Sequence, residues 1–210
     1  MNIKLKNITH VYDGKKLKLD NFSIQISQGE SICIIGKSGS GKTTLLNIIG
    51  LITRPSIGKV YYDDKCVLPN SKSAMYVRRS GIGYLFQNFA LNDSQSVLDN
   101  LLIALEYNKL SKKEKHKKIY EVLKEFDLES KINKKIYTLS GGEQQRIALA
   151  RIMLKECSVI LADEPTANLD SENEQLILNK LLRLNELGKT LIVVTHSKKI
   201  AGLFDKIIEL

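Results

Sequence analysis

The feature that most constrains this chain is a glycine-rich loop with the pattern Gly-x-x-x-x-Gly-Lys-Thr at residues 36–43. The apolar run at residues 32–35 has the length and β-branched content of a strand, and a helical pattern follows the loop. Glycines let backbone N–H groups converge on one anion, and a helix beginning near Gly41 adds the positive end of its dipole. Lys42 then reaches the β- and γ-phosphates, and the Thr43 hydroxyl can ligate Mg²⁺. The sequence therefore predicts a site for a nucleoside triphosphate and magnesium.

The whole loop contributes to this predicted site. Its nucleotide-binding residues are Gly36, Lys37, Ser38, Gly39, Ser40, Gly41, Lys42, Thr43 and Thr44. The alternative is a tight connection without a ligand, but that does not explain why the strand, lysine and helix patterns occur together. Kinases, GTPases and transport motors all carry such a loop, so the purpose of the nucleotide must be inferred from other segments.

Two carboxylates end a second apolar strand pattern, at residues 158–165. Successive strand side chains point to opposite faces, so Asp163 and Glu164 cannot share one role while the strand geometry holds. Asp163 suits magnesium, and Glu164 suits the attacking water as a catalytic base. His196 follows a third apolar run, at the strand end where α/β sheets place ligand-contacting residues. The alternative is that these are solvated charges and an ordinary surface histidine.

A second predicted anion-binding surface begins at Leu139-Ser140-Gly141-Gly142-Glu143. Ser140 and Glu143 have the spacing of a capping box at the start of a helix. Two glycines in the first turn cost about 1 kcal/mol each against alanine, and they leave the helix-end N–H groups unshielded. The pattern therefore indicates that something approaches this backbone closely.

The remaining segments predict a mixed architecture. Partial alternation at residues 2–11 and 17–26 indicates antiparallel strands, with a hairpin at Asp13-Gly14 and a tyrosine, Tyr12, that either stacks on a base or only packs. Residues 58–68 predict a strand pair that turns at Asp63-Asp64. Residues 88–137 predict an all-helical insertion, and a second capping box is predicted at Ser171 with Glu174.

Composition sets limits on location and partners. The net charge is +9, and the densest group of lysines, at residues 109–118, falls on a predicted amphipathic helix. That group indicates a solvated face first, and contact with phospholipid headgroups second. No apolar stretch approaches the roughly 20 residues that cross a bilayer, and no secretory signal begins the chain, so we expect a cytosolic location. The three cysteines lack zinc-type spacing and suggest reduced thiols.

Together, and in this order, the motifs resemble the ATP-binding cassette (ABC) family over essentially the whole chain. The resemblance implies an α/β P-loop NTPase with a RecA-like core, an antiparallel β patch and an α-helical subdomain. It implies one domain over residues 1–210, in which residues 1–87 and 138–210 form the nucleotide-binding core and residues 88–137 the helical subdomain. The implied cofactors are ATP and Mg²⁺, and the implied activity is ATP hydrolysis coupled to transport.

The resemblance also assigns roles to residues. It implies catalytic roles for Glu164, His196 and Gln87, and magnesium ligation by Thr43, Gln87 and Asp163. Besides the loop residues, it implies nucleotide contacts from Tyr12, Ser140, Gly141, Gly142, Glu143 and Asp170. The Ser140–Glu143 motif of one subunit then faces the Lys42 site of another in a head-to-tail homodimer.

Within the family, residues 46–60, 78–91 and 161–170 look like the group that includes the MacB macrolide exporter, the LolD lipoprotein-release ATPase and the FtsE cell-division ATPase. The short chain looks most like ATPases of Gram-positive bacteriocin and antimicrobial-peptide exporters. This implies a separate transmembrane permease subunit, a peripheral place on the inner face of the plasma membrane, and no nucleic acid. Two departures are Ala167, where glycine is commoner, and the loop at residues 91–96.

Three alternatives remain open from the sequence. A non-exporting FtsE-like or LolD-like ATPase would use the same cassette. A soluble ABC protein acting on ribosomes or DNA usually carries two cassettes or a long insertion, and this chain has neither pattern. A small-molecule kinase would explain the phosphate loop but not the Ser140–Glu143 motif.

Overall fold

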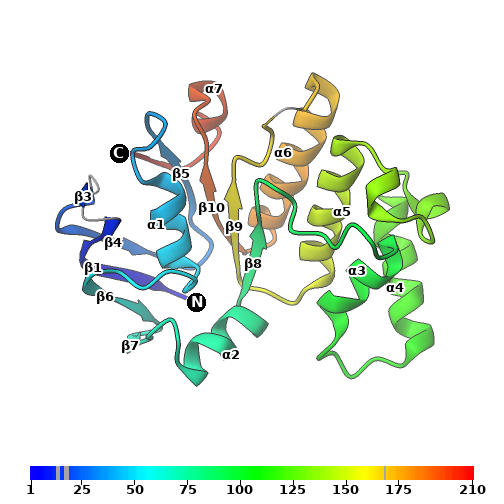
Figure 1. Ribbon diagram of the computed structural model, residues 1–210, viewed down its shortest axis with the longest axis horizontal. Helices are drawn as coiled ribbons and strands as arrows, with labels where there is room; N and C mark the ends of the chain where they lie inside the picture. The colour runs from blue at the N-terminus through cyan, green and yellow to red at the C-terminus, as the bar shows by residue number, and fades with distance from the viewer. Residues whose placement is uncertain (13–14, 17–18, 168) are drawn as a thin grey trace. The chain divides into compact units, whose positions relative to one another are not determined.

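The computed structural model describes residues 1–12, 15–16, 19–167 and 169–210 (Figure 1). It contains two compact units. The first unit comprises residues 1–84, 157–164 and 180–210, and the second comprises residues 85–156 and 165–179. Among the described residues, no helix combines the length and the apolar character that crossing a bilayer requires.

An antiparallel sheet of four strands forms one layer of the first unit. Its order is β4 (Phe22–Ile26), β1 (Ile3–Thr9), β6 (Ile57–Tyr62) and β7 (Lys65–Cys66). The short strands β2 (Val11–Tyr12) and β3 (Lys15–Lys16) pair separately, and the hairpin predicted at Asp13-Gly14 lies outside the described residues. Asp63 and Asp64 connect β6 to β7 with φ values of 45° and 62°, as a tight two-residue turn requires. The predicted antiparallel patch and this turn are confirmed.

A second sheet of five strands carries the phosphate loop. Its order is β11 (Lys206–Glu209), β5 (Ser31–Ile35), β10 (Thr190–Val194), β9 (Val159–Asp163) and β8 (Ile82–Leu85), and β11, β5, β10 and β9 are parallel. Strands β5, β9 and β10 are buried along their whole length, which explains their continuous apolar sequences. Val194 is level with both Ile34 and Asp163, so three strands end at the same edge of the sheet.

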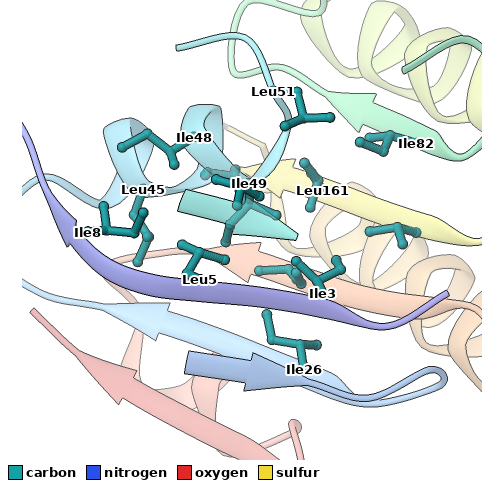
Figure 2. Packing of buried hydrophobic residues seen from close by; sticks show 14 of the residues in the cluster. Ile3, Leu5, Ile8, Ile26, Leu45, Ile48, Ile49, Leu51, Ile82 and Leu161 are labelled. Atoms are coloured by element: carbon teal, nitrogen blue, oxygen red, sulfur yellow. The ribbon is translucent and has the colours of Figure 1, made fainter. Parts of the chain in front are cut away.

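The core of the first unit lies where the two sheets and α1 (Lys42–Ile49) meet (Figure 2). Leu45, Ile48 and Ile49 on the helix pack among side chains of β1 and β9, among them Leu5 and Leu161. Each such fully buried side chain contributes about 1.5–3 kcal/mol relative to an exposed one. This packing holds the start of α1, and with it the phosphate loop, against the sheet.

Helix α2 (Lys72–Ser80) was not predicted from the sequence. Its N-cap is Ser71, whose side chain accepts a hydrogen bond from Ala74, but Ala74 is its only buried residue. A short helix with so narrow an apolar face gives a weak periodic signal. Helix α7 (Lys198–Ala201) completes the first unit, and α6 (Ser171–Glu186) contributes residues to both units.

The second unit is built mainly from helices: α3 (Val97–Leu102), α4 (Lys112–Lys124) and α5 (Gly141–Leu154), with short 3₁₀ turns η1 (Ile103–Leu105), η2 (Glu129–Lys131) and η3 (Ile136–Thr138). Helix α4 packs against α3 and α5 (Figure 1), and its buried residues are Ile119 and Leu123. Most of its lysines are exposed, in agreement with a solvated face.

Candidate nucleotide site

The phosphate loop connects β5 to α1 and has the backbone that an anion cradle needs. Gly41 is the N-cap of α1 with φ 99°, a left-handed conformation that favours glycine, and no side chain caps the helix. Gly36 approaches neighbouring atoms closely: an added Cβ would lie 2.7 Å from the Ser40 hydroxyl oxygen and would clash with the Leu210 carbonyl. The first helical N–H groups are therefore left to a ligand, as at other phosphate-binding helix ends.

Lys42 is buried and is held by the loop itself. Its Nζ donates hydrogen bonds to the carbonyl oxygens of Gly36 at 2.9 Å and Lys37 at 3.1 Å. An ammonium group has three donors, so one remains for a phosphate. The Ser40 hydroxyl is buried and has no hydrogen-bond partner among the described residues. Both observations fit a bound phosphate group, which would supply the missing acceptors.

Thr43 and Asp163 come together as a magnesium site requires. The Thr43 hydroxyl donates to Asp163 Oδ1 at 3.1 Å. Burial raises the pKa of the Asp163 carboxyl above its usual range, while the hydrogen bond from Thr43 acts in the opposite direction. Mg²⁺ in nucleotide sites takes one or two protein oxygen ligands together with phosphate oxygens and water. The two residues present fit that ion.

Glu164 points to a different partner from Asp163. Its backbone leaves the strand with φ 45°, a left-handed conformation uncommon for a glutamate, and its N–H donates to the Val194 carbonyl at 2.9 Å. Its Oε2 lies 3.1 Å from Nδ1 of His196, which is mostly exposed. Strained backbone of this kind persists where the surroundings fix it, and it clusters at functional sites. The different partners of Asp163 and Glu164 agree with the prediction that they cannot share one role.

The other loop residues lie around this centre. Lys37, Ser38 and Gly39 are exposed, and Thr44 is half-buried. Cys33 is buried in β5 beneath the loop, where burial, together with the charge of Glu164, raises the pKa of its thiol to about 12. A thiol with so high a pKa is not a nucleophile at neutral pH. The side chain of Tyr12 lies outside the part of the chain that the structure describes, so its adenine contact stays a prediction.

The second predicted anion surface lies at the start of α5 in the second unit; we call residues Ser140–Glu143 the signature tip. The predicted capping box is confirmed: Ser140 Oγ accepts from the Glu143 N–H at 3.3 Å, and Glu143 Oε2 accepts from the Ser140 N–H at 2.9 Å. Lys131 also binds Glu143, and this hydrogen bond is the main reason why the pKa of Glu143 lies below its usual range.

The glycines of the signature tip have different surroundings. Gly141 is exposed, with open space where a Cβ would stand. A Cβ on Gly142 would lie 3.2 Å from Asn173 Nδ2. In the described chain, the N–H groups of both glycines lack an acceptor, because the capping box serves the Ser140 and Glu143 N–H groups. The tip therefore presents two unshielded donors.

The start of α6 departs from the sequence prediction. The capping box predicted at Ser171 with Glu174 is wrong, because Ser171 is already the first residue of the helix. Asp170 caps it instead: its Oδ1 accepts from the Asn173 N–H at 2.8 Å, and this bond is the main cause of the lowered pKa of Asp170. Asn173 Nδ2 donates to Asp170 Oδ2 at 2.7 Å, and Arg146 of α5 donates to Asn173 Oδ1. Asp170 is thereby connected to α5 through Asn173 and Arg146.

Gln87 lies on an exposed turn of the second unit, so its predicted place beside Thr43 and Asp163 stays a prediction. The following residues Phe89 and Ala90 both have left-handed φ, at 62° and 49°. Arg151 of α5 donates to their carbonyl oxygens, at 2.9 Å and 2.6 Å. The sequence did not predict roles for Arg151, Lys131 and Asn173. Arg151 and Lys131 bind residues 12 or more positions away. Asn173 binds Asp170, and this pair was missed because the cap of α6 was predicted at Ser171.

A strand, phosphate loop and helix, with two carboxylates and a histidine at the ends of adjacent parallel strands, define a P-loop nucleoside triphosphatase. The family model described as ABC transporter matches residues 19–167. The chain belongs to the ABC transporter family, as an ATP-binding subunit that hydrolyses ATP and uses ATP with Mg²⁺. The predicted resemblance to the ABC family, and within it to the group of MacB and LolD, is confirmed, as is the fold class.

Three relatives illustrate this membership. The chain is 37% identical to the lipoprotein-releasing system ATP-binding protein LolD of Aquifex aeolicus, over 99% of this chain and 93% of LolD. It is 39% identical to the macrolide export ATP-binding/permease protein MacB of Campylobacter jejuni, over 99% of this chain but only 32% of MacB. A dimeric structure of the cassette MJ0796, a protein of Methanocaldococcus jannaschii, superposes with a TM-score of 0.91 at 40% identity, over 99% of this chain and 94% of that one.

Proposed function

We propose that this subunit works as a head-to-tail homodimer, in which the phosphate loop of one copy and the signature tip of the other bind the same ATP. The observation that carries this proposal is the pair of unshielded donors on Gly141 and Gly142, at a helix end where no described residue accepts a hydrogen bond from them. In a head-to-tail dimer, the two separate anion sites of the chain can bind the same nucleotide. The dimeric structures of the related MJ0796 cassette, one of them with ADP and Pi, support the arrangement.

In this proposal the chain's own residues divide the work. Lys42 and the loop N–H groups hold the phosphates, and Thr43, Asp163 and Gln87 hold the metal. Bound Mg²⁺ would supply positive charge that offsets the charge of the phosphate oxygens. Glu164 accepts the proton of the attacking water, and His196 orients its carboxylate from 3.1 Å. Tyr12 contacts the adenine, and Asp170 contacts the opposite nucleotide site.

The membrane partner and the transported compound form a finer proposal. We infer that the subunit acts with a separate transmembrane permease on the inner face of the plasma membrane, and that it exports a bacteriocin, an antimicrobial peptide or a related compound. The relative MacB, by its name, exports macrolides and carries its permease in the same chain. The match over 93% of LolD favours a second candidate, a stand-alone cassette that drives lipoprotein release.

The dimer is tested with Glu164→Gln, which should retain ATP without turning it over. With saturating Mg·ATP, multi-angle light scattering should show a shift from monomer to dimer. The matched control is the double variant Glu164→Gln with Gly141→Asp. It adds a negative charge where no described residue, apart from the helix backbone around Gly141, stands within 4 Å of the Cβ, and it should bind ATP but stay monomeric. A Glu164→Gln protein that remains monomeric, even with its permease, would overturn the proposal.

The cellular role is tested by purification of the tagged chain from detergent-solubilised cells. Co-purification of a membrane protein is expected, and mass spectrometry of that protein would distinguish an exporter from a lipoprotein-release system. Retention on ribosomes or DNA, without a membrane protein, would instead support the soluble alternative.

A further inference from the structure

Helix α4 of the second unit carries a dense positive charge that the nucleotide site does not use. Residues 109–124 contain seven lysines and two glutamates, which leaves +5 of the net charge of +9 in this short segment. Glu114 is occupied by the capping box with Ser111, and Glu121 lies 3.9 Å from Lys117. The surface of the helix is therefore positive after its own acids are counted.

Three of these lysines lie on one face of helix α4. Lys113, Lys117, Tyr120 and Lys124 have the spacing i, i+4, i+7 and i+11, which places them on one exposed face; we call them the basic stripe. Ile119 and Leu123, away from this face, are buried. Helix α4 contacts α3 and α5 (Figure 1). Tyr120 is 51% exposed, although it is a large aromatic residue. Lysines around an exposed tyrosine give a surface that is both cationic and amphipathic.

We propose that the basic stripe binds the anionic headgroups of a phospholipid membrane. The stripe belongs to a helix with six lysines, and four to eight basic residues on an amphipathic helix are typical of sites for anionic lipid surfaces. Lysine is a compact point charge on a flexible stem, suited to a diffuse field of headgroups, whereas nucleic-acid sites favour the planar fork of arginine. The stripe has one aromatic ring, and a single-stranded nucleic acid would need several for base stacking. Since the apolar face is buried, binding depends on charge and on the tyrosine at the interface.

The test uses co-sedimentation of the full chain with vesicles of phosphatidylglycerol and phosphatidylcholine in equal parts, and with phosphatidylcholine alone. Binding to the anionic vesicles only is expected. It should weaken at high salt, because the Debye length is about 8 Å at physiological ionic strength and shortens as salt is added. The triple variant Lys113→Gln, Lys117→Gln and Lys124→Gln should lose roughly a hundredfold in partitioning, about fivefold for each lysine.

A matched control removes the same charge elsewhere. Lys4, Lys6 and Lys59 are exposed on β1 and β6, and their change to glutamine should weaken vesicle binding far less. Both triple variants should keep the basal ATPase rate, which separates this proposal from the dimer proposal. Equal losses in the two variants would mean that only net charge matters, and would overturn the proposal. Absence of vesicle binding, or a stripe that binds polyglutamate or RNA but not vesicles, would overturn it as well.

Discussion

At the phosphate loop, the charged groups are buried and already bonded within the chain: Lys42 to loop carbonyls, and Asp163 to Thr43. At the signature tip, the N–H groups of exposed Gly141 and half-buried Gly142 have no acceptor among the described residues, and the side chains of Ser140 and Glu143 cap the helix end. Buried charges are costly until a ligand completes their surroundings, whereas an exposed helix end costs little without one. The two regions should therefore respond differently to substitution, the first in chemistry and nucleotide affinity, the second in assembly.

The largest effect is expected for Glu164→Gln. Loss of a general base commonly lowers turnover by about 10²–10⁴-fold, and glutamine keeps the shape and a hydrogen bond to His196. Phosphate release should fall within this range, while binding of a fluorescent ATP analogue stays close to that of the unmodified protein. The control Glu172→Gln changes an exposed glutamate of α6 and should leave turnover unchanged. Unchanged turnover in Glu164→Gln would remove this residue from the base role.

Lys42→Ala should act on affinity. Hydrogen bonds to charged groups contribute about 1.5–3 kcal/mol, so the dissociation constant for ATP should rise about 10–100-fold. Titration of the monomer with a fluorescent ATP analogue measures this directly. Lys59→Ala removes an exposed lysine of β6 and serves as the control. Retention of full affinity by Lys42→Ala would contradict the assigned phosphate contact.

Gly141→Ala should affect stability and activity with opposite signs. Alanine in place of glycine stabilises a helix by about 1 kcal/mol, and beyond the helix backbone none of the residues that the structure describes stands within 4 Å of the added Cβ. The melting temperature should rise by about 2–4 °C. Turnover should nevertheless fall by about tenfold, because in the proposed dimer the methyl group shields the donors that bind the other copy's nucleotide. Full turnover in this variant would mean that nothing approaches the tip.

Local patterns made much of this fold predictable. The buried strands β5, β9 and β10, the turn at Asp63-Asp64 and the capping box of α5 all follow from residues close together in sequence. The separate partners of Asp163 and Glu164 follow from strand alternation, although the structure adds a left-handed Glu164 that alternation does not predict. In each case the signal and the structure span only a few residues.

The rest depends on contacts that the sequence does not encode locally. Lys131 reaches Glu143 across 12 positions, and Arg146 reaches Asn173 across 27. The cap of α6 was misplaced by one residue because Asp170 and Ser171 are both good N-cap residues, and only the backbone path decides between them. Helix α2 buries a single residue, too little for a periodic signal. Long-range pairs and competing caps are thus where sequence reasoning ends.

The smallest effects on stability are expected at Asp163 and Asp170, whose pKa values are shifted in opposite directions. Burial raises the pKa of Asp163, so ionisation disfavours the folded state, and stability falls as the pH rises through the folded pKa. The N–H of Asn173 lowers the pKa of Asp170, so its contribution is present above the ordinary pKa of about 3.9 and is lost below the folded pKa. Without nucleotide at neutral pH, Asp163→Asn should raise the melting temperature by a few degrees, about 2–4 °C for each kcal/mol.

Asp170→Asn should lower the melting temperature slightly at neutral pH, since asparagine keeps the cap but not the charge. The melting-temperature changes of Asp163→Asn and Asp170→Asn, each relative to the unmodified protein, should shrink as the pH approaches the ordinary pKa of aspartate. Differential scanning fluorimetry over that pH range measures both. With saturating Mg·ATP the sign for Asp163→Asn should reverse, because the unmodified carboxylate then has a cation to bind and the amide does not. A gain in melting temperature that persists with Mg·ATP would mean that Asp163 has no part in holding the metal, whatever its distance from Thr43.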